Sequence, residues 1–420
     1  MTPRTTVPRT IGPRTIGRRT GRGRRARRRS QGGFTLVEMM VALVAGLIAI
    51  GSIYYVSSVS ADHFHEQQRI AQSQMSLRMA IEQVRRDFGR AAMMGTPASA
   101  REQTCPTIAP PPIPIQGIQV FDGGATAGLD LAAVNNVQAD RVLLTGNYLT
   151  SDFYELRISD AAGRTLFLRQ DRQSFRRTFN DVATAAYIPA AFADVFRVGR
   201  MLHVKNQNGF HFFTIITGVN AANASVTINP AINPAATCQQ GQGMGGLQRG
   251  TQVAPLNRIE YTVLNVGGTA ALATLDNPLS PLAGVRGPAL VRREVQFDGA
   301  ATPIAGTERV VMEYVAEFDV DLMVDTAVAP GVPPNLQRFD DLNVSAISAP
   351  GGRAFAVRSA LIALSSRSAA EDSRFAYAPR PGAAAPLTHY ELSAAAVGAA
   401  RVRTLRTEVV LPNLVNRGLR

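Results

Sequence analysis

The sequence predicts an α+β protein, in which a long N-terminal helix packs on antiparallel β-sheet and an enlarged β-rich C-terminal region follows. Three observations predict this fold. An apolar stretch covers residues 34–56, an amphipathic heptad pattern continues it, and short alternating runs separated by Gly, Pro and Asn fill the rest of the chain. With 420 residues, of which 45% are hydrophobic, the chain can bury a sizeable core.

Most of the excess basic charge lies in the first 33 residues. The formal net charge is +13, but residues 1–33 hold eleven Arg and no acid, which leaves 33 basic and 31 acidic residues in the remainder. This segment repeats Pro-Arg-Thr and has almost nothing apolar to bury, so we expect a disordered basic leader. Without it the charge does not indicate a nucleic-acid partner, and we expect none.

Residues 34–56 form a membrane-spanning candidate. The stretch contains one charge, Glu38, and at about 1.5 Å per residue a helix of this length crosses a bilayer. The Arg residues in front of it orient the helix by the positive-inside rule, so we expect residues 96–420 to be an exported β-rich globular region. A cleaved secretory signal ending at Val59-Ser60-Ala61 is a rival, but the apolar stretch is about twice the usual length for one.

The helix continues beyond the membrane as an amphipathic segment over residues 57–95. Apolar residues repeat every seven positions, with a second seam position between them, and charged residues occupy the other faces. The seam consists of Ile70, Leu77, Ile81, Val84, Phe88 and Ala91. We therefore expect one helix from about Phe34 to Met94, ended by Gly95, Pro97 and the proline-rich run that follows.

Short runs after the helix predict strands. Several alternate apolar and polar residues, as in Glu317-Phe318-Asp319-Val320-Asp321-Leu322, which is typical of a half-buried strand. The predicted strands are residues 141–145, 154–158, 165–168, 201–204, 210–217, 225–228, 258–264, 290–297, 310–324, 356–364 and 404–411.

The chain has two cysteines, Cys105 and Cys238. They lie 133 positions apart and lack the close CxxC pairing of a zinc or redox site. In an exported protein they would form one disulfide, whereas in a cytosolic protein they would be two buried thiols. The export signals favour the disulfide.

The residues around the start of the apolar stretch, RRRSQGGFTLVE, resemble the class III signal peptide of the type IV pilin family. A basic leader precedes Gly33, Phe34 follows it, and Glu38 is the fifth residue after the junction. The resemblance implies cleavage between Gly33 and Phe34 by a prepilin peptidase, N-methylation of Phe34, and a pilin-like fold. It also implies that Glu38 meets the Phe34 amine of a neighbouring subunit and sets the assembly register.

Physical arguments support two of these residues. Gly33 has no Cβ, so its backbone can lie flat in a protease site at the membrane. A carboxylate such as that of Glu38 costs at least a few kcal/mol in lipid unless it finds a partner. The alternative is an ordinary signal anchor whose Glu38 reaches back to the interface.

Later segments resemble the large minor pilins of the PilW type. The resemblance rests on the helix end over residues 77–91, Phe196-Arg197-Val198-Gly199, Leu290-Val291-Arg292-Arg293 and the closing run Glu408-Val409-Val410-Leu411-Pro412-Asn413-Leu414. It implies a low-copy subunit that primes, caps or decorates a type IV pilus. It places the protein in the inner membrane first, and then in a surface pilus or a periplasmic pseudopilus, with other major and minor pilins as partners through the helix.

Three other patterns are weaker. Gly241, Gly243 and Gly246 match GxGxxG without the flanking strand and helix of a dinucleotide site, so we expect a loop and no cofactor. His63 and His65 lie beside acidic residues, but two positions apart they face different sides of a helix, so we expect no metal there. The acidic neighbours are Asp62 and Glu66.

Carboxylates on one strand face leave a calcium site open as an alternative. Oxygen ligands suit Ca²⁺, but the same spacing is typical of the wet face of an edge strand. The residues are Glu317, Asp319, Asp321 and Asp325.

No nucleophile elbow or HExxH motif frames the Ser, His and Asp residues of the chain, so we expect no enzyme. The nearest rival function is a minor pseudopilin of a type II secretion system. Another is a pilus-tip adhesin or DNA receptor, for which the local basic cluster is Arg169, Arg172, Arg176 and Arg177. A membrane-tethered enzyme would need a convergent polar site in the β-rich region.

Overall fold

The computed structural model describes most of the chain after the leader. The described residues are 34–102, 115–232, 247, 250–266, 287–327, 332–340, 343–348, 353–372, 374–382, 385–393 and 398–414. The chain divides into two compact units, Met1–His65 and Glu66–Arg420, and each is described by itself.

Helix α1 runs over Leu36–Phe88 without interruption. The expected end near Met94 was wrong by six residues. After Phe88 the backbone tightens into turns, and Ala92 and Met94 adopt left-handed φ angles of 59° and 56°. Gly89 allows this change because it has the lowest helix propensity after proline.

Fifteen strands and four short α-helices follow α1 in the described residues. The helices are α2 (Ala132–Asn135), α3 (Gln173–Phe179), α4 (Pro189–Val195) and α5 (Val344–Ser348). The strands are β1 (Ile118–Phe121), β2 (Arg141–Gly146), β3 (Tyr154–Ser159), β4 (Thr165–Leu168), β5 (Met201–Lys205), β6 (His211–Asn220), β7 (Ser225–Asn229), β8 (Gln252–Asn265), β9 (Pro288–Val295), β10 (Arg309–Glu313), β11 (Val315–Asp325), β12 (Leu336–Phe339), β13 (Val357–Arg367), β14 (His389–Tyr390) and β15 (Ala400–Val410).

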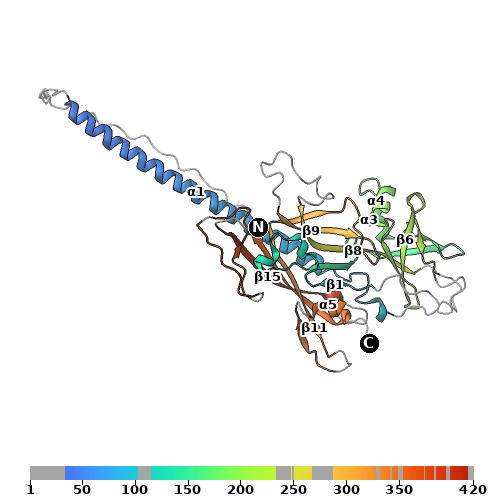
Figure 1. Ribbon diagram of the computed structural model, residues 1–420. Helices are drawn as coiled ribbons and strands as arrows, with labels where there is room; N and C mark the ends of the chain where they lie inside the picture. The colour runs from blue at the N-terminus through green and yellow to red at the C-terminus, as the bar shows by residue number, and fades with distance from the viewer. Residues whose placement is uncertain are drawn as a thin grey trace, which may run out of the picture. The chain divides into compact units, whose positions relative to one another are not determined.

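Strand β8 belongs to two sheet structures (Figure 1). Its first residues pair with β3 on one side and β5 on the other, and the path β8-β3-β4-β7-β6-β5 returns to β8, so these six strands close into what we call the barrel. Its later residues pair with β2 and β9, which with β1 and β10 form what we call the central sheet.

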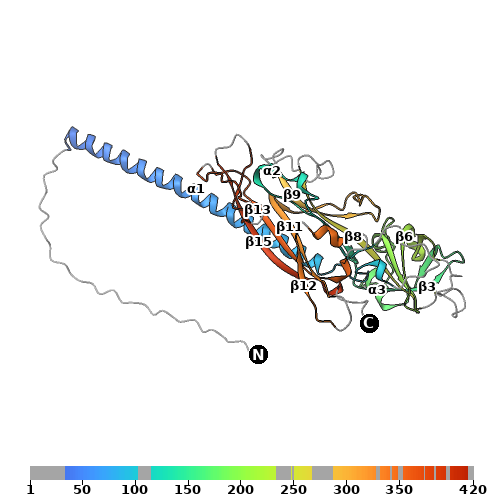
Figure 2. The same cartoon turned by 60° about the horizontal axis from the view of Figure 1, so that its bottom comes forward.

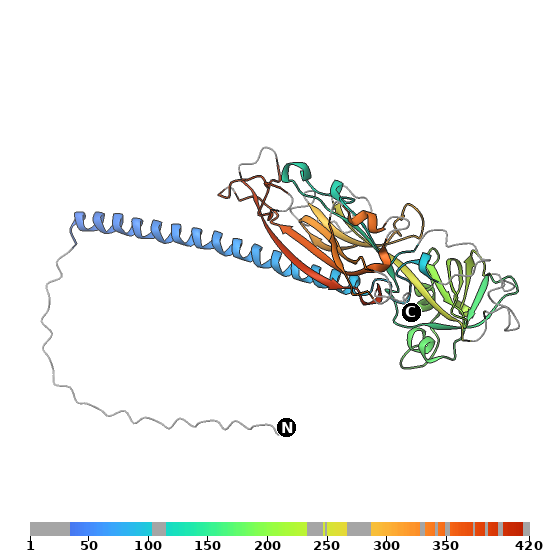
Figure 3. The ribbon, with the colours of Figure 1, turned by 90° about the horizontal axis from the view of Figure 1, so that it is seen from below.

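The C-terminal sheet has the order β12-β11-β13-β15-β14 and is antiparallel throughout. Figure 2 shows β11, β13 and β15 side by side. Helix α1, from Leu77 onward, contributes to one core shared by this sheet and the central sheet, and Figure 3 shows that part of the helix running along the red C-terminal strands. The Ser73 and Ser366 hydroxyl oxygens, 3.1 Å apart, mark the start of this contact.

The heptad seam predicted the buried face of the helix. Leu77, Val84 and Phe88 have exposed fractions of 2% or less, and Ala91 is buried just beyond the helix end. Ile70 is half-buried. The apolar spacing therefore identified the face that packs on the sheets.

The barrel has its own aromatic core. Five aromatic side chains pack at centroid distances of 4.6 to 6.4 Å. Three of them belong to α3 and α4, and a fourth directly follows α4. They are Tyr154, Phe175, Phe179, Phe192 and Phe196. Edge-to-face and tilted contacts of this kind stabilise a small core beyond the area that they bury.

The strand predictions differ from the structure in instructive places. The predicted run 310–324 is two strands, because Tyr314 has a φ of 56° and turns the chain between β10 and β11. Strand β8 begins at Gln252, six residues before the predicted start, because Pro255 reads as a break although it lies inside the paired strand. The sequence did not predict the short strands β1, β12 and β14.

Candidate functional site

The first turn of α1 is a reciprocal capping box between Thr35 and Glu38. The Glu38 N–H donates to the Thr35 hydroxyl oxygen at 3.2 Å. The Thr35 N–H and hydroxyl both donate to Glu38 Oε2, at 3.0 Å and 3.1 Å. These bonds satisfy N–H groups that a helix start leaves without partners, and they hold the carboxylate beside the residue that follows Phe34.

The following residues form a helix suited to lipid. The stretch Leu36–Ala61 has a mean hydropathy of 2.3, and none of its most apolar part is buried in the protein. It is long and apolar enough to cross a membrane. Phe34, at the head of the helix, is 85% exposed.

Asp87 fastens the far end of α1 to the central sheet. Its Oδ2 accepts hydrogen bonds from the Tyr261 hydroxyl at 2.8 Å and from Arg292 Nε at 2.6 Å. Its backbone carbonyl accepts from the Tyr148 hydroxyl at 3.2 Å. Burial, and secondly the Asp87 charge, hold the pKa of Tyr261 well above its usual range. This network fixes the last turn of the helix on β8 and β9.

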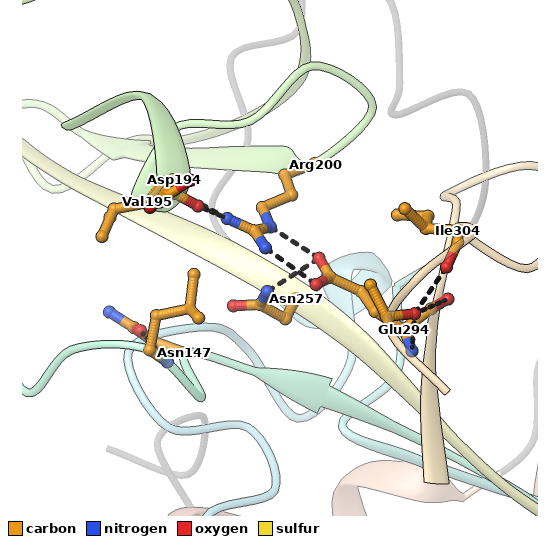
Figure 4. Close-up of polar contacts among 9 residues, drawn as sticks. Asn147, Asp194, Val195, Arg200, Asn257, Glu294 and Ile304 are labelled. Carbon is orange, nitrogen blue, oxygen red and sulfur yellow. Dashed lines mark hydrogen bonds and ion pairs between the residues drawn. The ribbon is translucent and has the colours of Figure 1, made fainter. Parts of the chain in front are cut away.

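A second buried network joins the barrel to the central sheet (Figure 4). Arg200, just before β5, donates to both carboxylate oxygens of Glu294 on β9, at 2.6 Å and 2.8 Å. It also donates to the Asp194 and Val195 carbonyls at the end of α4. Asn257 on β8 donates to the same carboxylate at 2.8 Å. The bidentate geometry makes this pair a rigid connection.

Several predicted site residues lie outside the described part of the chain. They are Gly33, Cys105, Cys238, Gly241, Gly243 and Gly246. The cleavage site and the disulfide therefore remain predictions. His63 and His65 fall within α1, but their side chains and those of Asp62 and Glu66 are also outside the description. In the residues that are described, no cluster of three or more His, Cys, Asp or Glu could hold a metal ion.

The carboxylates of β11 face arginines. Arg380 Nη1 lies 2.6 Å from Glu317, and Arg358 Nη2 lies 3.0 Å from Asp325. Arg338 pairs with Asp321 from β12. These cations already supply the positive charge that a calcium ion would bring, so the geometry does not favour a calcium site there.

The basic cluster at residues 169–177 is largely paired. Arg169 binds both Glu155 and Asp171, and Arg172 binds Glu155 at 2.7 Å. Arg177 pairs with Asp152. A nucleic-acid site needs cations free to meet phosphates, and here acidic partners occupy three of the four arginines.

The N-terminal residues match a known family model, the Prokaryotic N-terminal methylation motif, over residues 28–54. The chain therefore carries the N-terminal methylation motif of prepilins. The motif implies processing by a prepilin peptidase and assembly with other pilins. The match begins in the basic leader and ends inside the apolar part of α1, so it covers the capping box of Thr35 and Glu38.

The chain is also similar to a solved structure, a type IV-like pilin from Thermus thermophilus. The two chains share 13% sequence identity over 54% of this chain and 94% of that one, with a TM-score of 0.19. Such a loose superposition carries no argument about function. No curated protein matches the chain.

The sequence did not single out the residues that attach the helix and barrel to the central sheet. Asp87 belongs to no recognisable motif, and Arg200 and Glu294 are 94 positions apart. Long-range ion pairs of this kind leave no periodic signal. Glu294 gave one hint, because it ends a run of three charged residues, Arg292-Arg293-Glu294, inside a predicted strand.

Proposed function

We propose that this protein is a minor pilin, a low-copy structural subunit of a type IV pilus that the PilW-type resemblance places among the large minor pilins. The observation that carries the proposal is the methylation motif at the head of one uninterrupted helix. The barrel adds bulk beside the helix-and-sheet core. A subunit of this size is awkward to stack many times, which supports a priming, capping or tip position.

In this proposal Glu38 is the assembly residue. Cleavage after Gly33 creates a new amine on Phe34, which methylation leaves basic. Thr35 already occupies one oxygen of Glu38, and the other oxygen can meet the amine of a neighbouring subunit. The pairing neutralises two charges that both lie in lipid, so it favours assembly of the subunits in one register.

The remaining expectations follow from the same reading. The residues after the helix are exported, Cys105 and Cys238 form a disulfide there, and the protein has no enzymatic activity or cofactor. Neighbouring genes would separate a pilus subunit from a type II secretion pseudopilin, since a pilus operon and a secretion operon differ in their other components.

Mass spectrometry of the mature N-terminus tests the proposal. In membranes of the native host we expect the wild-type protein to begin with methylated Phe34. Gly33→Asp should block processing, because the aspartate side chain cannot lie flat in the protease site. Gly32→Ala, one residue earlier, is the matched control and should be processed.

Two outcomes would contradict this proposal. A mature chain that begins at Asp62 would identify an ordinary secretory signal, and a chain that keeps its leader in a host with active prepilin peptidase would remove the prepilin assignment. If processing is normal, quantification of the subunit in sheared filaments decides between a minor and a major role.

A further inference from the structure

A pair of histidines, one buried and one half-buried, lies where the barrel meets the segment that leaves α1. His203 on β5 and His211 on β6 stack with ring centroids 5.1 Å apart and an interplanar angle of 12°. Phe213 stacks on His203 as well, at 4.8 Å. His203 is 3% exposed. Both histidines lie on the outer face of the barrel, because the alternate residues Leu202 and Phe212 belong to its core.

Hydrogen bonds determine where the protons of this pair reside. His203 Nδ1 lies 2.7 Å from the Met94 carbonyl oxygen, which can only accept, so this nitrogen carries a hydrogen. His203 Nε2 lies 2.9 Å from His211 Nδ1. A neutral His203 then accepts at Nε2, and His211 must donate from Nδ1.

The other nitrogen of His211 faces a carboxylate. His211 Nε2 lies 3.5 Å from Glu102 Oε2, and the Thr96 hydroxyl donates to Glu102 Oε1 at 2.6 Å. When both rings are neutral, the lone pair of Nε2 points at a negative oxygen. One proton added at Nε2 turns this repulsion into a charge-assisted hydrogen bond. A second proton, on His203 Nε2, would instead break the bond between the rings.

We propose that the His203–His211 pair is a proton-dependent latch that takes up a single proton on His211 and thereby fastens residues 94–102 to the barrel. The charged groups that the hydrogen bonds and the strand register place beside His211 are Glu102, which favours the proton, and Lys205, which lies opposite His211 in the β5–β6 pairing and opposes it. The latch closes as pH falls and opens as pH rises.

The position of the latch gives it a structural consequence. Met94 lies just after the helix end, and the Ser99 N–H donates to the Ile115 carbonyl at 2.8 Å, so this segment is hydrogen-bonded to the chain that leads into β1. Loss of the Glu102 contact would release one side of the segment from β6. Residues 94–102 could then move away from β6 without any change in the helix, while β8 and the Arg200–Glu294 pair hold the barrel on the central sheet.

Nitrogen NMR and hydrogen exchange on the full-length protein in detergent test this inference. Between about pH 5 and pH 8, the ring nitrogens of His203 and His211 should titrate together, with uptake of one proton assigned to His211. Glu102→Gln should move that titration to lower pH, because the amide keeps the size and loses the charge. Exchange of residues 94–102, corrected for the intrinsic rate, should be slower at low pH in the wild type and lose this dependence in Glu102→Gln.

The control is His389→Gln, a histidine that stacks on Phe375 at 4.0 Å in another part of the chain. It should leave both readouts unchanged. Independent titration of the two rings, with two protons bound, would overturn the inference. So would an exchange rate in residues 94–102 that does not depend on pH. Neither readout depends on pilus assembly, so a failure here would not count against the minor pilin proposal.

Discussion

Among single polar residues, Asp87 predicts a large effect on stability. Asp87→Asn keeps the shape but leaves the partly buried Arg292 cation without its counter-charge. Removing one partner of such a pair costs about 3 kcal/mol or more. Urea unfolding of the purified full-length protein in detergent should show a lower midpoint.

Glu82→Gln is the matched control for Asp87→Asn. Glu82 pairs with Arg85 on the exposed side of the same helix, at 2.9 Å. An exposed pair contributes about 0 to 1 kcal/mol, so the midpoint should hardly move. Equal effects of the two substitutions would show that Asp87 does not fasten the helix to the sheet.

Because the pKa of Tyr187 is raised, we expect the protein to lose stability at alkaline pH. Burial raises the pKa of its hydroxyl from 10.0 to about 12, and the hydroxyl donates to the Ala221 carbonyl at 2.5 Å. Above pH 10 the unfolded chain loses this proton before the folded chain does. The folded state therefore binds more protons in that range, and stability falls as pH rises from about 10 to about 12.

The measurement is unfolding free energy as a function of pH in wild type and Tyr187→Phe. The slope between about pH 10 and pH 12 should be less steep in the variant, because the variant lacks the one proton of the Tyr187 hydroxyl. Below pH 10 the two curves should run parallel. Identical slopes above pH 10 would mean that the Tyr187 hydroxyl titrates alike in the folded and unfolded chains.

Between elements, two backbones can come into close contact where one of the residues is a glycine, which has no Cβ. Gly128, before α2, lies against β8, and a Cβ there would stand 2.0 Å from the Val263 carbonyl oxygen. The strand cannot retreat, because Val263 also pairs with Leu290 on β9. We expect Gly128→Ala to destabilise the protein by about 1 to 3 kcal/mol in urea unfolding.

Gly299→Ala is the control for Gly128→Ala. An added Cβ at Gly299 meets nothing within 4 Å, and its φ is not in the left-handed region. The substitution should be close to neutral. A neutral Gly128→Ala would show that the segment before α2 can shift away from β8.

For the whole molecule, the sharing of β8 predicts that the barrel and the central sheet unfold together. Phe179→Ala in the barrel core should cost about 3 to 5 kcal/mol, and the loss should reach β9 as well as β5, because one strand holds both. Hydrogen-exchange mass spectrometry would follow protection in both strands. Loss of protection in β5 alone would show that the barrel unfolds by itself.

Val182→Ala is the control for Phe179→Ala. Val182 lies three residues further along the chain and is fully exposed. Its truncation removes no buried contact, so protection in both strands should stay at the wild-type level.

The sequence alone determined the parts of this protein that rest on local pattern. The apolar run after Gly33, the heptad seam from Leu77 to Phe88 and the alternation in β11 each follow from the period of a helix or strand. The residues around Phe34 and Glu38 likewise predicted the methylation motif that the family model matches. The helix end was placed too late, because the turns at Ala92 and Met94 depend on packing that a period does not encode.

How those parts are joined depends on long-range contacts that the tertiary structure reveals. The closure of six strands through β8 depends on pairings between residues far apart in the chain. The sequence-based prediction also missed the first six residues of β8, because Pro255 was read as a break. Asp87 and Arg292 are 205 positions apart, and Asn257 and Glu294 are 37 apart. His203 contacts the backbone carbonyl of Met94, which has no sequence signature. Local period fixes which residues face inward, whereas long-range pairing fixes what they meet there.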